Sequence, residues 1–254
     1  MRRLIIGTLI LASLLPAACG GKQVDPVTAK RADLHYKVGI DALSRGQLPK
    51  AFEELLLADE IRPDHAETLS ALGYAWRLRG ELKKSEQTYK RALRAAPSSS
   101  IYNNYGSLLL QMNKPKLAEK QFRLALEDPR YRSQDLVYLN LGDALLAQDK
   151  FNDAVAAYRQ ATLINPNQKT LAMLKEANAY LKFNRLHYAR TMYETIFSEQ
   201  PQNRAALEGL VDVLKRQKNF TKARQHLKTY RSKATDPLDK AWASDELEGI
   251  KSHD

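Results

Sequence analysis

Apolar residues recur with helical spacing from residue 32 to residue 235, in groups separated by short polar stretches. No run shows the strict alternation of apolar and polar residues that indicates a half-buried strand. The helical groups themselves repeat about every 34 residues, so one structural unit is copied along the chain. We therefore predict an all-α fold built from about six such units.

Four positions define the repeated unit. A small residue recurs at Ala51, Ser85, Ala118, Ala154, Ala189 and Ala223. A second small position precedes it by twelve residues, at Gly39, Gly73, Gly106, Gly142, Ala177 and Val211. A large apolar residue follows four residues after the first position, and a proline closes most units. Small residues let the two helices of a unit approach closely, and proline cannot continue the second helix.

This pattern resembles the tetratricopeptide repeat, whose signature places a small residue, an alanine, an aromatic residue and a proline at matching intervals. The resemblance implies a superhelical solenoid of antiparallel helix pairs, in which stacking of the units makes the core. The six repeats are predicted at 32–65, 66–98, 99–132, 135–168, 170–203 and 204–235. Residues 236–254 are predicted to form a capping helix and tail, with Leu238, Trp242 and Leu247 facing inward.

The first 18 residues have the pattern of a secretory signal. Arg2 and Arg3 precede a mostly apolar stretch, and small residues lead to Cys19, the single cysteine of the chain. The segment resembles a bacterial lipoprotein signal, although Pro16 stands where that pattern usually has Leu. An ordinary signal peptide with an incidental cysteine is the alternative. The lipoprotein resemblance implies a lipid on Cys19, such as palmitate, followed by a tether over residues 19–31; Gly20 favours sorting to the outer membrane.

Charge adds little to this picture. Lys and Arg number 40 against 29 acidic residues, and loss of the two signal arginines leaves 38 against 29, a net charge of +9. The basic residues are spread along the chain, with no patch interleaved with aromatic residues. A solvated surface is therefore the better interpretation, and nucleic acid is not an expected partner.

Catalytic chemistry is also not expected. The five histidines are scattered, no pair of them has metal-ligand spacing, and a Cys/His zinc site would need a second cysteine. The sequence has no Gly-rich phosphate loop and no nucleophile elbow. We predict that the protein is not an enzyme, and that it carries no metal and no cofactor beyond the covalent lipid on Cys19.

Binding is the function that a helical solenoid offers, because its first helices line a concave groove. In the tetratricopeptide register, the groove positions are predicted at Tyr36, Ile40, Leu43, Tyr74, Arg77, Asn103, Leu110 and Leu139. The set is unusually apolar, which predicts an amphipathic helix or an extended apolar peptide as the ligand. A register error of one residue would exchange groove and core positions, so each residue could instead belong to the core.

The third repeat carries a more specific resemblance. Its "IYNNYGSLLLQMNKPKLAEKQFRLALEDPRY" is similar to the PilF/PilW family of type IV pilus biogenesis lipoproteins, which have an "NNYG" helix followed by a helix ending in "DP" and a tyrosine. Residues 103–106, Leu109, Asp128, Pro129 and Tyr131 match that pattern. The fourth repeat, "VYLNLGDALLAQDKFNDAVAAYRQA", is also similar. Leu108 and Leu109 depart from the family's frequent Phe, and Asn113 departs from its Gly.

The family resemblance implies a pilotin, an assembly factor without enzymatic activity. Such a protein is anchored by lipid on the periplasmic face of the outer membrane, binds the secretin subunit of the type IV pilus, and promotes secretin localisation and multimerisation. A monomer is expected. The alternative is a tetratricopeptide lipoprotein that serves another envelope machine, as an adaptor for peptidoglycan hydrolases or in outer-membrane protein insertion.

Overall fold

The computed structural model describes residues 25–251, and the predicted signal segment, Cys19 and the first residues of the predicted tether lie outside this range. Within it the chain forms thirteen α-helices and one short 3-10 helix. The elements are α1 Pro26–Ser44, α2 Leu48–Ile61, α3 Ala66–Leu78, α4 Leu82–Ala95, α5 Ser99–Gln111, α6 Pro115–Ala125, α7 Gln134–Leu146, α8 Phe151–Ile164, η1 Pro166–Gln168, α9 Lys169–Lys182, α10 Leu186–Glu199, α11 Arg204–Arg216, α12 Phe220–Lys233 and α13 Pro237–Lys251.

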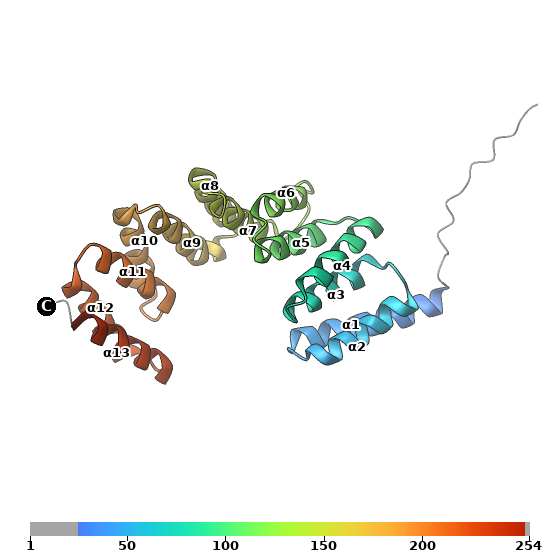
Figure 1. Ribbon diagram of the computed structural model, residues 1–254, viewed down its shortest axis with the longest axis horizontal. Helices are drawn as coiled ribbons and strands as arrows, with labels where there is room; N and C mark the ends of the chain where they lie inside the picture. The colour runs from blue at the N-terminus through green and yellow to red at the C-terminus, as the bar shows by residue number, and fades with distance from the viewer. Residues whose placement is uncertain (1–24, 252–254) are drawn as a thin grey trace, which may run out of the picture.

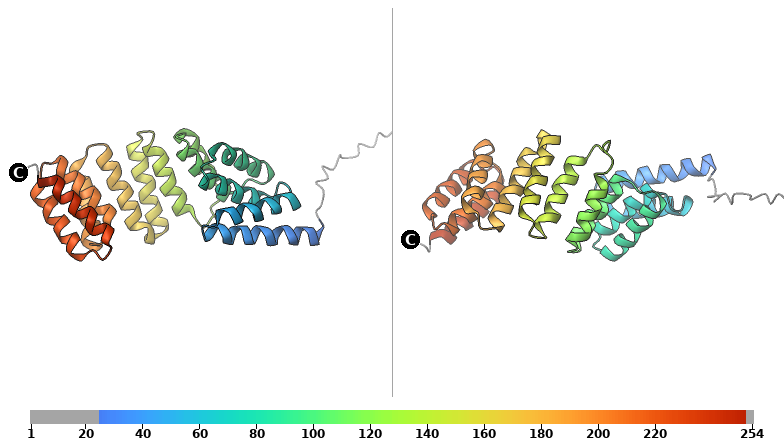
Figure 2. Two further views of the ribbon diagram at one scale, coloured as in Figure 1. Left: turned by 60° about the horizontal axis from the view of Figure 1, so that its bottom comes forward. Right: turned by 90° about the horizontal axis from the view of Figure 1, so that it is seen from above.

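The helices stack as pairs along a curved arc (Figures 1 and 2). Each odd-numbered helix from α1 to α9 packs most extensively on the helix that follows it, α11 contacts both α10 and α12, and each pair contacts the next. The first helices of successive pairs also contact one another along the whole arc, from α1 to α11. They therefore form the inner wall of the curve. The all-α solenoid predicted from the repeat is confirmed over the described residues.

The repeated small and large positions meet where the two helices of a pair cross. A Cβ atom added at Gly73 would lie 3.0 Å from the ring of Tyr89, and one added at Gly106 would lie 2.6 Å from the ring of Phe122. Both rings are fully buried. The first small position of the repeat is buried in every pair, at Ala51, Ser85, Ala118, Ala154, Ala189 and Ala223. Close approach of the paired helices thus depends on these side chains being small.

The turn inside each pair uses one residue with positive φ. These residues are Gly46, Gly80, Asn113, Asp149, Asn184 and Lys218. A left-handed residue directly after a helix lets the chain reverse while the last carbonyls accept hydrogen bonds from the turn. Asn113, where the sequence departs from the family's glycine, fits because Asn adopts this conformation more easily than most residues.

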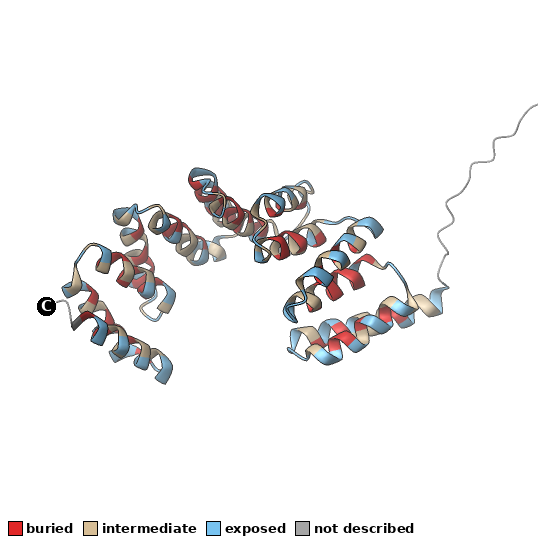
Figure 3. Ribbon diagram, in the orientation of Figure 1, coloured by how far each residue is buried: buried red, intermediate tan, exposed pale blue. Residues whose placement is uncertain are grey.

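The core runs along the solenoid as three successive clusters of buried side chains (Figure 3). The first joins α2 and α3, the central one extends from α3 to α9, and the last joins α9 to α13. Each cluster lies between stacked helices rather than at one centre. No unit therefore buries its apolar face without its neighbours.

Two details differ from the sequence-based expectations. The predicted tether over residues 19–31 is too long, because α1 begins at Pro26. Asp25 caps this helix, since its Oδ1 accepts hydrogen bonds from the N–H groups of Val27 and Thr28, each at 3.0 Å. The opening turn of α1 is mostly exposed, so no apolar periodicity marked it as helical.

The capping helix also packs with a different face. Leu238 was expected to face inward, but it is exposed. Leu247 is buried as predicted, and Ala243 and Ile250 complete the buried face of α13. Trp242 is half-buried against the ring of Tyr230. The apolar stripe of α13 therefore begins about one turn later than the sequence suggested.

Candidate functional site

A hollow of about 230 Å³ lies on the inner wall where α1, α3 and α5 meet. Its lining brings together four of the predicted groove residues, Tyr36, Ile40, Leu43 and Tyr74. Ser70, Ala71 and Glu67 of α3 and Ser100, Ile101 and Asn104 of α5 complete it. This part of the inner wall is concave and rich in aromatic and aliphatic surface, with a few polar groups at its edge. We name it the groove hollow.

The tyrosines of the groove hollow are held by neighbouring groups. The ring of Tyr36 meets the ring of His65 edge-on, with centroids 6.1 Å apart. Burial, together with the nearby carboxylate of Glu67, raises the pKa of the Tyr36 phenol above its usual value. Tyr36 therefore keeps its proton near neutral pH and can donate a hydrogen bond while its ring offers apolar surface.

Arg77 lies beside the groove hollow rather than in it. Its guanidinium carbon stands 5.0 Å from the centroid of the Tyr74 ring, within reach of a cation–π interaction. Its Nε is buried and has no hydrogen-bond partner among the described residues, and the same holds for the hydroxyl of the neighbouring Tyr89. The cation–π contact of Arg77 thus helps to hold the Tyr74 ring in place.

Asparagine and serine side chains connect the first helices across the inner wall. Asn104 donates to the hydroxyl of Ser70 over 3.5 Å, which joins α5 to α3. Asn140 donates to Oδ1 of Asn103 over 3.0 Å and to the hydroxyl of Ser107 over 3.5 Å, which joins α7 to α5. Asn103, predicted to face the groove, thus has one amide oxygen engaged by its neighbour.

Two predicted groove residues lie elsewhere. Leu110 is half-buried and packs against the central core cluster, away from the groove hollow. Leu139 is only 2% exposed and belongs to that cluster itself, so the prediction that it lines the groove is corrected. The physical reason is its position on α7, which α5 and α9 both contact, so that a long apolar side chain there is covered by its neighbours.

Ion pairs cross the far half of the inner wall, on whose helices α7 and α9 the leucines Leu136 and Leu171 are also exposed. Asp143 on α7 pairs with Lys175 on α9 at 2.6 Å and accepts a hydrogen bond from the hydroxyl of Tyr158 at 3.0 Å. Lys215 on α11 pairs with Glu246 on the capping helix. These ion pairs join successive units. The groove hollow at the N-terminal end is the place where four of the predicted groove residues lie together.

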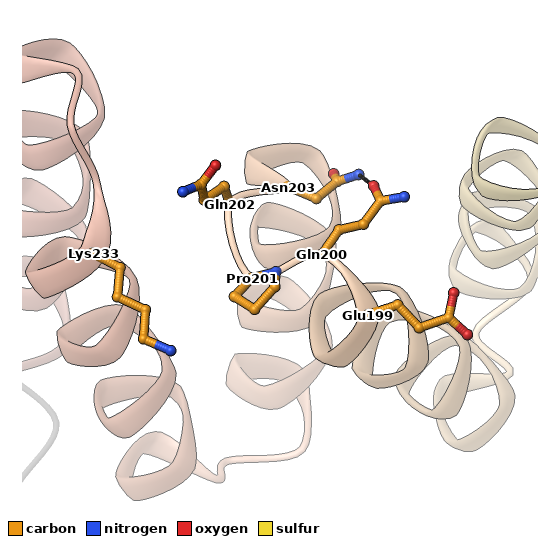
Figure 4. A pocket seen from close by; sticks show the side chains of 6 residues that line it. All are labelled: Glu199, Gln200, Pro201, Gln202, Asn203 and Lys233. Carbon is orange, nitrogen blue, oxygen red and sulfur yellow. Dashed lines mark hydrogen bonds between the residues drawn. The ribbon is translucent and has the colours of Figure 1, made fainter.

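A larger hollow, of about 560 Å³, lies outside the groove at the turn between α10 and α11 (Figure 4). Its lining is polar, from Glu199 through Asn203 together with Lys233 of α12. The amide of Asn203 donates to Oε1 of Gln200 over 3.1 Å, so the polar groups partly satisfy each other. None of the residues predicted for binding lies here.

Metal-ligating side chains do not cluster in the part of the chain that the structure describes. No group of three or more His, Cys, Asp or Glu side chains there is arranged to hold a metal ion. Within residues 25–251, none of the helices has the length and hydropathy needed to cross a bilayer.

Comparison with protein families identifies the repeats. Models described as tetratricopeptide repeat match residues 38–100 and 174–237, residues 99–127, and residues 136–168. The first of these models alone covers half of the chain. The chain belongs to the tetratricopeptide repeat family. The paired helices and the inner wall described above are thus those of a tetratricopeptide solenoid.

Individual tetratricopeptide proteins are also similar to this chain. It is 27% identical over 176 residues to the type IV pilus assembly protein PilF of Pseudomonas aeruginosa. The aligned region covers 69% of each of the two chains. The solved structure of P. aeruginosa PilF matches with a TM-score of 0.70 at 22% identity, over 90% of this chain and all of that one.

The fold similarity extends to two further solved tetratricopeptide proteins. PilW, described as a widely conserved type IV pilus biogenesis factor, matches with a TM-score of 0.75 at 19% identity, over 86% of this chain and 97% of that one. YrrB, described as having an unusual peptide-binding site, matches with a TM-score of 0.56 at 19% identity, over 70% of this chain and 90% of that one. At these identities both comparisons establish the fold alone.

Proposed function

We propose that this protein is a pilotin, a lipid-anchored assembly factor that binds the secretin subunit of the type IV pilus and promotes its localisation and multimerisation. It acts at the periplasmic face of the outer membrane and has no enzymatic activity. The groove hollow is the observation that carries the proposal, because it presents Tyr36, Ile40, Leu43 and Tyr74 on one concave surface. The sequence similarity to PilF supports the pilus system as the setting.

The groove hollow suits an apolar segment of a client protein. An amphipathic helix or extended strand can place apolar side chains against Ile40 and the tyrosine rings, while its backbone or polar side chains meet Ser70 and Asn104 at the edge. Apolar surface of this kind is costly to leave in water, so a secretin segment that is buried only in the finished ring would be shielded here before assembly.

A lipid on Cys19 would make this binding effective at the membrane. Two or more acyl chains give stable anchoring, because each buried CH₂ contributes about 0.8 kcal/mol. An anchored solenoid keeps its bound client close to the bilayer, which raises the local concentration of the client where insertion takes place.

Deletion of the gene tests the assembly role. We expect a large loss of secretin multimers from outer-membrane fractions and a loss of twitching motility, both restored by the intact gene on a plasmid. Normal multimers and normal motility in the deletion strain would refute the pilotin proposal. Defects in peptidoglycan or in other outer-membrane proteins, with pili intact, would instead favour the scaffold of another envelope machine.

The anchor has a separate test. Cys19→Ala should abolish incorporation of radiolabelled palmitate and move the protein out of the membrane fraction. The fold should be retained, because Cys19 lies outside the helical repeats. Circular dichroism of the purified variant checks the fold, and an unchanged lipid label would contradict the anchor.

A further inference from the structure

The outer face of α1 occupies a position that every later unit buries. Leu34 stands five residues before Gly39, and the equivalent residues are Thr68, Ile101, Val137, Ala172 and Ala206. All five equivalents are buried, on first helices that each pack against the preceding pair. Leu34 is 60% exposed, because no unit precedes α1 among the described residues. This face is therefore the open end of the solenoid.

The open end is basic as well as apolar. A continuous stripe runs along α1 at intervals of one or three residues, and it consists of Val27, Lys30, Arg31, Leu34 and Lys37. They line a shallow depression of about 500 Å³, and Val27 is 78% exposed. We name this stripe the N-terminal face.

The charges of the N-terminal face are available for an outside partner. The side chains of Lys30, Arg31 and Lys37 are exposed, and none has an ion-pair partner among residues 25–251. The acid that lines the depression, Asp33, lies 3.7 Å from Arg62 of α2, and Asp25 at the start of α1 interacts electrostatically with Arg31 without an ion pair. The stripe therefore presents unpaired positive charge beside two exposed apolar side chains, a combination that suits an anionic surface with an apolar interior.

The length of chain before α1 places this face near a bilayer. Six residues lie between Cys19 and Pro26, so seven residue-to-residue steps join the two, and fully extended these steps span at most about 25 Å. Helix α1 also projects beyond α2 at the end where the chain enters (Figures 1 and 2). A lipid on Cys19 would thus hold the first turns of α1 within reach of the head groups.

We infer that the N-terminal face docks on anionic phospholipid. Lys30, Arg31 and Lys37 contact the head-group phosphates, and Val27 and Leu34 enter the interfacial region. The inference rests on the proposed anchor at Cys19, which brings the face to the membrane. Because Tyr36 and Ile40 lie on the same helix, docking would hold the groove hollow about one helix diameter, roughly 10 Å, from the bilayer.

Vesicle sedimentation of the chain from residue 20 onward tests this docking. This chain keeps every described residue and lacks the lipid. It should sediment with vesicles of equal parts phosphatidylglycerol and phosphatidylcholine at low salt, and much less with phosphatidylcholine alone. Lys30→Gln/Arg31→Gln/Lys37→Gln should weaken the binding about 100-fold, since each basic side chain at an anionic surface contributes about fivefold.

A matched control separates a specific face from net charge. Lys222→Gln/Lys228→Gln/Lys233→Gln removes the same charge from exposed positions on α12, at the other end of the solenoid, and should bind like the unaltered chain. Val27→Ser/Leu34→Ser should also weaken vesicle binding relative to the unaltered chain. This difference should remain at high salt, because the lost contact is apolar. Circular dichroism verifies that each variant is folded.

Three results would overturn the inference. The two triple variants could bind vesicles equally well. The unaltered chain could also sediment no more with phosphatidylglycerol-containing vesicles than with phosphatidylcholine alone. Sedimentation equilibrium could also show a dimer that Val27→Ser/Leu34→Ser dissociates, which would assign the face to a second copy of the chain. The vesicle assay contains neither secretin nor lipidated Cys19, so its failure leaves the pilotin proposal standing. Conversely, normal pili in the deletion strain would refute the pilotin proposal, and the result of the vesicle assay would still stand.

Discussion

Gly106 shows how a single residue sets the spacing of a helix pair. A Cβ atom there would stand 2.6 Å from the buried ring of Phe122. Alanine would gain about 1 kcal/mol of helix propensity, but overpacking a well-filled core costs about 1–3 kcal/mol. We predict that Gly106→Ala lowers the free energy of unfolding by about 1–2 kcal/mol, measured by urea denaturation.

The partner ring supplies the control for this prediction. Phe122→Leu leaves space at the crossing, so the double variant Gly106→Ala/Phe122→Leu should lose less stability than the two single variants together. Strictly additive losses would show that the two residues do not compete for the same space.

Glu86 links two repeats through charge. Its hydrogen bond with Lys90, and then that with Lys114 of the next repeat, lower the pKa of the Glu86 carboxyl from 4.5 to about 2 against the opposing effect of burial. A lowered folded-state pKa stabilises the fold above pH 4.5, and this stabilisation is lost as the pH falls from 4.5 to 2. Because both lysines are partly exposed, we expect about 1–2 kcal/mol.

Urea titrations across this pH range test the link. Glu86→Gln should be less stable than the unaltered chain at pH 7 and should lose less stability on acidification. Glu53→Gln, at an exposed glutamate of α2 without an ion pair among the described residues, should follow the unaltered chain. Parallel curves for the unaltered chain and Glu86→Gln would contradict the assignment.

At the scale of helices, the repeat period predicted the pairs but not every face. The small and large positions have fixed spacing, so one alignment located all six crossings. On α7, however, Leu136, Leu139 and Leu146 repeat the apolar character of the core positions, and no polar face marks the groove. Burial of Leu139 depends on its neighbours α5 and α9, and the sequence of α7 does not contain that information.

The groove hollow was predictable only in part for the same reason. Tyr36, Ile40, Leu43 and Tyr74 follow from the register of the repeat, and the structure brings them together. The start of α1 at Pro26 depends on the cap from Asp25, a local signal without apolar periodicity. Val27, Lys30 and Arg31 of the N-terminal face therefore lay in the segment that was interpreted from the sequence as a tether.

The capping helix α13 allows a prediction about a whole element. Ile250 is fully buried and joins the last core cluster, so Ile250→Ala should cost about 2–4 kcal/mol. Because each unit contacts only its neighbours, the loss should be local. Hydrogen exchange should speed up in α11, α12 and α13 and stay unchanged in α1 to α4.

Leu238 on the same helix is the matched control, because it is exposed. Leu238→Ala should leave both exchange and stability unchanged. Uniformly faster exchange along the whole chain for Ile250→Ala would show instead that the solenoid unfolds as one cooperative unit.

At the scale of the whole molecule, the groove hollow lies at the N-terminal end of the inner wall, and ion pairs cross the far half of that wall. A client that binds the groove hollow, as proposed, would lie at one end of the solenoid, on the same helix as the N-terminal face. A client bound at the groove hollow would then remain beside the bilayer while the far repeats extend away from it.

Two exposed aliphatic residues of nearly equal accessibility test this placement of the client. Ile40 lines the groove hollow and is 38% exposed, while Leu57 lies on α2 outside that lining and is 37% exposed. Ile40→Asp removes apolar contact worth about 1.5–3 kcal/mol to a bound client and should weaken client binding roughly 10- to 100-fold. Secretin multimers should fall accordingly in cells producing Ile40→Asp, but not in cells producing Leu57→Asp. Equal multimers in the two strains, at matched amounts of folded protein, would move the client off the groove hollow.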